Sequence, residues 1–168
     1  MLNMINGLPS HVLLVHAVVI LVPLAALLAV VGSVWPAARQ YLGALTPLTA
    51  LAGLVFVPLA SNAGEWLQEH VPDTTLVDRH AEMGGGLLVW AGLLFLITLS
   101  IWLLDLASKR AWRVPTPLLS RWVRPVGSVL LCAVAVVSVV QVFRIGDSGA
   151  KAAWEGRVNT HSGSGSRN

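Results

Sequence analysis

The sequence predicts an all-α integral membrane protein folded as a bundle of four transmembrane helices. Three observations predict this class: the composition, four long apolar runs, and the charges of the segments between them. Of the 168 residues, 55% are hydrophobic and 11% are charged, whereas soluble domains carry about 25% charged residues. The mean hydropathy of +0.73 is likewise too high for a soluble domain of this size.

The four apolar runs are each long enough to cross a membrane as a helix. Crossing a hydrocarbon core of about 30 Å takes about 20 helical residues, and only a helix or a closed barrel satisfies the backbone there. The runs are continuous and not alternating, which favours helices. We expect a single four-helix transmembrane domain over residues 1–159, with helices at about 10–31, 42–61, 76–104 and 126–145, and a flexible polar tail over 160–168.

Local signals predict where some of these helices begin and end. Ser10 follows a turn and is of a type that caps helix starts. Thr75 and Asp78 stand three residues apart, as in a capping box, which predicts a helix start near Leu76. Beyond the fourth run, residues 146–149 predict a turn, which a short interfacial helix would follow.

The charges between the runs predict the orientation. The segment 105–125 carries five Lys and Arg residues against one acid, whereas 61–80 carries four acids and one Arg. Because short cytoplasmic loops are enriched in Lys and Arg, 105–125 is expected in the cytoplasm. The chain is then a multi-pass protein of the cell (plasma) membrane with both termini non-cytoplasmic. Nucleic-acid binding is not expected, because the cations serve orientation.

This orientation places all five histidines on the non-cytoplasmic side: His11, His16, His70, His80 and His161. His16 is the most unusual, because an ionisable residue within a span is costly and usually faces the bundle or a cavity. The alternative for His16 is an interhelical hydrogen bond. For His11 and His70 the alternative is solvation at the membrane surface, and His161 belongs to the tail.

Imidazole is a good ligand for haem iron, copper and zinc. A b-type haem between helices needs two imidazoles on opposing helices, and His16 and His80 are the leading candidates for haem or metal binding. His11 and His70 are further cofactor-binding candidates. Gly84–Gly86 directly follow His80 and leave space for a flat macrocycle or for close helix contact. No catalytic residues can be assigned, and a stand-alone enzyme is not expected.

Three segments carry a resemblance to a known family: GLPSHVLLVHAVVILVPLAAL at the start, HAEMGGGLLVWAG around His80, and RIGDSGAKAAWEG after the fourth run. In these the chain resembles a bacterial membrane family catalogued as domain of unknown function 2231. The resemblance implies a four-helix membrane module, found fused to or beside redox domains of Rieske type. It thereby implies electron transfer or haem binding. Where many relatives are expected to carry a histidine after RIG, this chain has Asp147.

Three functions remain open from the sequence. The first is a redox protein that binds haem b or a redox metal for electron transfer, with a redox or membrane protein as its partner. The second is a non-catalytic membrane scaffold or subunit of a partner complex. The third is a transporter or small-molecule channel, although the centres of the spans offer few polar side chains, namely Thr49, Trp90, Thr98 and Ser138. A lipid bilayer surrounds the protein in each case, and a homo-oligomer is also open.

Overall fold

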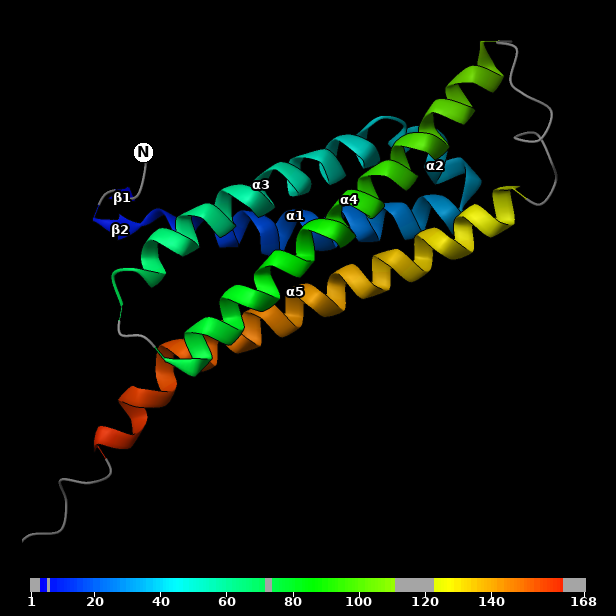
Figure 1. Ribbon diagram of the computed structural model, residues 1–168. Coiled ribbons are helices and arrows are strands. Elements are labelled where there is room, and N and C mark those ends of the chain that lie inside the picture. Colours follow the sequence, from blue (N-terminus) through cyan, green and yellow to red (C-terminus); the bar gives the residue numbers. More distant parts are fainter. Residues whose placement is uncertain (1–3, 6, 72–73, 111–122, 162–168) are drawn as a thin grey trace, which may run out of the picture.

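The computed structural model describes residues 4–5, 7–71, 74–110 and 123–161, which form an all-α four-helix bundle (Figure 1). The four long helices are α1 (Ser10–Val34), α3 (Leu45–Gln68), α4 (Thr75–Lys109) and α5 (Val123–His161). A short helix, α2 (Pro36–Leu42), joins α1 to α3. Before α1, the two-residue strands β1 (Met4–Ile5) and β2 (Leu8–Pro9) pair antiparallel. The predicted fold class is confirmed.

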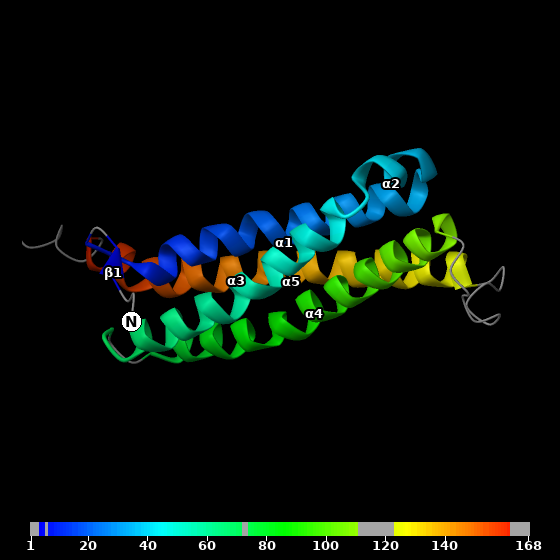
Figure 2. The ribbon, with the colours of Figure 1, turned by 90° about the horizontal axis from the view of Figure 1, so that it is seen from above.

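Each long helix packs mainly against two others, in the cyclic order α1, α3, α4, α5. In consequence α1 and α4 occupy opposite corners of the bundle, with α3 and α5 between them (Figure 2). The start of α1 and the end of α5 lie at the same end of the bundle, and α2 lies at the other (Figure 1). We call the end that holds His11 and His80 the histidine end.

The core is built in layers that repeat every seven residues along each helix. Seven residues make about two turns, so the same helix face stays inward from one layer to the next. The layer nearer the histidine end consists of four buried apolar residues: Val18, Val57, Leu87 and Val142. The next layer consists of four more: Ala25, Ala50, Leu94 and Ala135. The four helices are therefore in register along the bundle.

Many of the buried side chains are small, whereas many large apolar side chains are exposed on the outside of the bundle. Ala25 is 0% exposed and Ala135 is 2% exposed, whereas Ile20 is 62%, Val129 is 71% and Phe143 is 75% exposed. Small residues let membrane helices approach closely, and exposed large apolar residues are typical of a surface that faces lipid. All four long helices are long and apolar enough to cross a membrane. The chain is thus a multi-pass membrane protein, while its orientation and its membrane stay predictions.

Two predicted helix caps differ in the structure. Thr74, and not Thr75, caps α4, because its hydroxyl oxygen accepts a hydrogen bond from the backbone N–H of Val77 at 3.3 Å. Ser10 is the first residue of α1 and its side chain forms no cap hydrogen bond. Both caps were predicted within one residue of the observed helix start.

The turn predicted at residues 146–149 is wrong, because α5 continues through them to His161. Among the described glycines, positive φ angles occur at Gly7 and Gly43, so Gly146 and Gly149 keep the ordinary helical backbone. An ion pair between Asp147 and Lys151, at 2.8 Å and spaced i,i+4, supports the helix there. The described part of the chain ends within the expected polar tail, and residues 162–168 lie outside the described residues.

At the end opposite the histidines, α2 is fastened to the bundle. Arg39 Nε lies 3.0 Å from Asp105 Oδ2, which joins α2 to α4. Gly32 of α1 lies beneath the Arg39 side chain, since a Cβ at Gly32 would lie 3.7 Å from Arg39 Cβ. Asp105 is therefore part of an ion pair that links α2 to α4.

Candidate functional site

The imidazole rings of His11 and His80 meet at the histidine end of the bundle. Their ring centroids are 6.3 Å apart and their planes are inclined by 86°. His11 comes from the first turn of α1 and His80 from the second turn of α4. Both side chains are partly buried. The structure thus brings together two of the four histidines predicted as candidate ligands, and they come from opposite corners of the bundle.

Position along the helices explains why these two rings meet. His11 lies seven residues before the buried Val18, and His80 lies seven residues before the buried Leu87. Each histidine therefore continues the inward face of its helix by two turns. On the other two helices, Gly64 and Gly149 lie seven residues after the buried Val57 and Val142. The outermost layer of the core consists of two histidines and two glycines.

The two glycines make room for the two rings. A Cβ added at Gly64 would lie 3.0 Å from both Cε1 and Nδ1 of His11. A Cβ added at Gly149 would lie 2.9 Å from Cε1 of His80. The contact at Gly149 is shorter than real Cβ atoms show, and the contacts at Gly64 are tighter than most, so a larger residue at either position would shift the ring. Gly64 and Gly149 thus shape the space around the two rings, a role that was not predicted from the sequence.

Hydrogen bonds hold each ring by the same nitrogen. His11 Nδ1 lies 2.8 Å from the carbonyl oxygen of Ala60 in α3. A carbonyl oxygen accepts and does not donate, so Nδ1 of His11 carries the proton. The other nitrogen, Nε2, then has a lone pair available when the ring is neutral.

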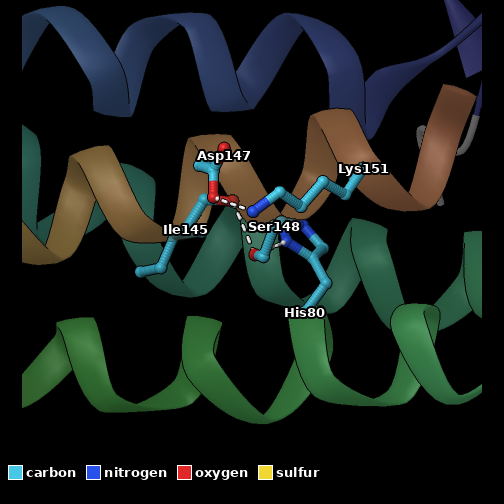
Figure 3. A network of polar contacts seen from close by, with 5 residues as sticks. All are labelled: His80, Ile145, Asp147, Ser148 and Lys151. Atoms are coloured by element: carbon cyan, nitrogen blue, oxygen red, sulfur yellow. Dashed lines mark hydrogen bonds and ion pairs between the residues drawn. The ribbon is translucent and has the colours of Figure 1, made fainter. Parts of the chain in front are cut away.

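His80 is held in the same way by α5. Its Nδ1 lies 2.9 Å from Ser148 Oγ, and the Ser148 hydroxyl donates to the carbonyl oxygen of Ile145 at 2.8 Å (Figure 3). Because the Ser148 proton is used in that bond, Ser148 Oγ accepts from Nδ1–H of His80. As at metal sites, where a second hydrogen bond fixes the tautomer and orients the ring, this leaves Nε2 as the free nitrogen.

Ser10, next to His11 in the chain, is a buried polar residue without a partner. Its side chain is 2% exposed, and Ser10 Oγ forms no hydrogen bond within the described part of the protein. By contrast, the buried hydroxyls of Thr49, Thr98 and Ser138 each donate to a carbonyl of their own helix. An unpaired buried hydroxyl costs roughly 1–3 kcal/mol. A hydrogen bond from Ser10 Oγ to a group bound at this end would remove that cost.

His16 does not join the pair. It is exposed on the outer surface of α1, and its Nδ1 donates to the carbonyl oxygen of Val12 at 2.6 Å, within the same helix. His16 lies two residues before the buried Val18, which is about 160° around the helix from the inward face. The structure therefore pairs His80 with His11, whereas the sequence analysis favoured His16 as the partner of His80.

The remaining predicted residues also lie apart from the pair. His70 is exposed and stacks on Trp66, with ring centroids 4.2 Å apart, and its Nδ1 donates to the carbonyl oxygen of Trp66. His161 is the last residue of α5. Cβ atoms at Gly84–Gly86 would meet no atom within 4 Å. These three glycines therefore serve no close helix contact, and the surface beside them is open.

The pair supplies two nitrogen ligands. Within the residues that the structure describes, no group of three or more His, Cys, Asp or Glu side chains could hold a metal ion. Structural zinc sites use four protein ligands, so this donor set does not suit such a site. Two imidazoles suit the two axial positions of a haem iron, or a metal ion of low coordination number.

Comparisons with family models, curated proteins and solved structures give no match for this chain.

Proposed function

We propose that this multi-pass membrane protein transfers electrons through a redox metal centre, a b-type haem or a copper ion, bound by His11 and His80. The observation that carries the proposal is the geometry of the pair. The two rings come from different helices, lie 6.3 Å apart and are inclined by 86°. Each ring is oriented by a hydrogen bond at Nδ1, which leaves Nε2 for a metal.

The ring separation supports two imidazoles on opposite sides of one metal ion. Each metal–nitrogen bond is about 2 Å and each ring adds about 1.2 Å, so the ring centres would lie roughly 6.4 Å apart. The separation of His11 and His80 is 6.3 Å. The perpendicular ring planes are compatible with this arrangement, because both planes can contain the line that joins the two nitrogens through the metal.

The packing around His11 and His80 places different demands on a bound copper ion and on a bound haem. A copper ion would require little separation of α1 and α4, because the distance between the ring centroids is already close to the required one. A haem macrocycle would require α1 and α4 to move apart at this end, because the rings are packed against Gly64 and Gly149. The open surface of α4 beside Gly84–Gly86 is the side on which a macrocycle would find room.

The location of the pair fits electron exchange with a partner outside the membrane. His11 and His80 lie near the starts of their helices, close to where the chain leaves the apolar part of the bundle. We infer that the partner is a redox protein on the side where both termini lie. The resemblance to a family found beside redox domains of Rieske type agrees with this inference.

The visible absorption spectrum and metal content of the protein purified from its native membrane test the proposal. A Soret band that shifts on reduction with dithionite would identify haem. Copper at one ion per chain, with a one-electron redox change, would identify the ion. A colourless protein that contains less than one tenth of an equivalent of iron or copper, and that takes up neither haemin nor copper, would contradict the proposal.

A second function is favoured by the hydrogen bonds that His11 and His80 form to neighbouring helices. His11 joins α1 to α3 through Ala60, and His80 joins α4 to α5 through Ser148. The pair thus fastens all four helices at one end without any bound group. In this second reading the protein is a non-catalytic scaffold or subunit of a membrane complex. It predicts that substitution of either histidine lowers thermal stability in a protein that binds neither haem nor metal.

A further inference from the structure

A hollow of ≈ 160 Å³ lies in the groove between α4 and α5, directly beside His80. A single bound water needs about 10–15 Å³ measured in the same way, so the hollow has room for a larger group. Three cationic and three apolar side chains line most of it: Arg79, Arg144, Lys151, Leu76, Met83 and Phe143.

The lining residues lie on one face of each helix. On α4, Leu76, Arg79 and Met83 follow the spacing i, i+3, i+7. On α5, Arg144, Ser148 and Lys151 follow the spacing i, i+4, i+7. Residues at these spacings lie on one face of a helix. The hollow is therefore a continuous groove between α4 and α5 and not a set of unrelated surface positions.

The charge of this groove is positive and largely uncompensated. Lys151 pairs with Asp147 at 2.8 Å (Figure 3). Arg79 and Arg144 are both exposed and form no hydrogen bond or ion pair with another residue in the described part of the chain. Asp147 also lines the hollow, but its carboxylate pairs with Lys151, so the two guanidinium groups are not paired with it. Guanidinium is the group best suited to bind phosphate through two parallel hydrogen bonds.

Cationic and apolar side chains lie next to one another along this groove. Met83 and Phe143 lie toward the middle of the bundle, and Phe143 is 75% exposed. Arg79 lies about one turn further out on α4, and Lys151 lies two turns further out on α5. Arg144 is adjacent to Phe143, and Leu76 lies beyond Arg79. The groove therefore presents cationic and apolar side chains together at this end of the bundle.

We propose that this groove binds an anionic phospholipid, with its phosphate between Arg79 and Arg144 and its upper acyl chain along Met83 and Phe143. The positive charge of the groove favours an anion, and its apolar lining residues favour a lipid over free phosphate. The site lies beside the histidine pair and shares Ser148 with it, but it does not require a metal there.

Binding of short-chain lipids to the delipidated full chain in neutral detergent tests the proposal, with native mass spectrometry as the measurement. The probes are dioctanoyl phosphatidylglycerol, dioctanoyl phosphatidylcholine and inorganic phosphate. We expect the anionic lipid to bind at least tenfold more tightly than the zwitterionic lipid, and inorganic phosphate to bind too weakly to detect. Arg79→Gln and Arg144→Gln should each weaken binding of the anionic lipid five- to tenfold.

Two further variants make the result specific. Lys109→Gln removes the same charge at the opposite end of α4 and should leave lipid binding unchanged. Arg144→Lys keeps the charge but loses the guanidinium group that can form two parallel hydrogen bonds. It should therefore weaken binding less than Arg144→Gln does. Equal binding of the two lipids, or an equal loss in Lys109→Gln, would overturn the proposal. Inorganic phosphate that binds as tightly as the anionic lipid would overturn the assignment to a lipid.

Discussion

The ring of His11 lies 6.3 Å from the ring of His80, although their helices occupy opposite corners of the bundle. The contact across the diagonal exists because the two intervening helices carry glycine at the same level. Gly64 lies against His11, and Gly149 lies against His80. At this level two large rings and two glycines stand where the next layer has four apolar side chains. The glycines leave the space that the two rings occupy.

Gly149→Ala should destabilise the protein, whereas Gly146→Ala should not. The Cβ at Gly149 would lie 2.9 Å from His80 Cε1, while a Cβ at Gly146 meets nothing within 4 Å. Overpacking costs roughly 1–3 kcal/mol, and alanine in an open helical position gains up to about 1 kcal/mol over glycine. Denaturant unfolding followed by circular dichroism measures both. Equal stability of the two variants would contradict the packing of His80 on Gly149.

Ser148→Ala should lower the free energy of unfolding by roughly 1–3 kcal/mol, because Nδ1–H of the partly buried His80 loses its acceptor. Ser100→Ala is the matched control. Its hydroxyl is exposed and donates to the carbonyl of Leu96 in the same helix, so its loss should change stability by less than about 0.5 kcal/mol. Thermal melts in the same detergent compare the two. A similar loss in both variants would show that the hydrogen bond to His80 contributes nothing specific.

A double-mutant cycle on His11→Ala and His80→Ala should give a coupling energy of roughly 0.5–1.5 kcal/mol, because the rings are in contact. The same cycle on His16→Ala and His80→Ala should give no coupling, because His16 lies on the outer surface of α1. Unfolding free energies of the single and double variants supply both values. Additive losses for His11 and His80 would indicate that the two rings act independently.

The presence of four apolar spans follows from the sequence, because length and hydropathy determine whether a segment can cross a bilayer. Their ends were harder to predict, since α5 continues to His161 instead of ending near residue 145. The inward face of each span was harder to predict. These helices are apolar on all sides, so no polar stripe marks the outside. A signal was nevertheless present: His11, Val18 and Ala25 are spaced by seven, as are His80, Leu87 and Leu94, whereas His16 falls outside this row.

The glycines of the site could not be predicted in the same way. Gly146 and Gly149 belong to one motif, and both read as turn residues in the sequence. Gly149 in fact gives space to His80, whereas Gly146 faces open surroundings. The difference depends on the register between α4 and α5, which is set by packing over the whole length of the helices and not by local sequence.

Labelling of single cysteines tests the predicted orientation. The chain has one natural cysteine, so Cys132→Ser gives a background free of thiols. In this background, Glu69→Cys, at the histidine end, should react in intact cells with a maleimide that cannot cross membranes. Gln40→Cys, at the opposite end, should react only after the cells are opened. Both positions are exposed. The reverse pattern would place the histidine end in the cytoplasm.

The most direct test of the central claim is a comparison of His11→Ala with His16→Ala in binding of the redox centre. The purified chain, stripped of metal, is titrated with Cu(II) and separately with haemin, with His80→Ala as a third variant. We predict one equivalent bound per chain, a loss of at least tenfold in affinity for His11→Ala and His80→Ala, and unchanged binding for His16→Ala. Binding that survives in His11→Ala and is lost in His16→Ala would contradict the account.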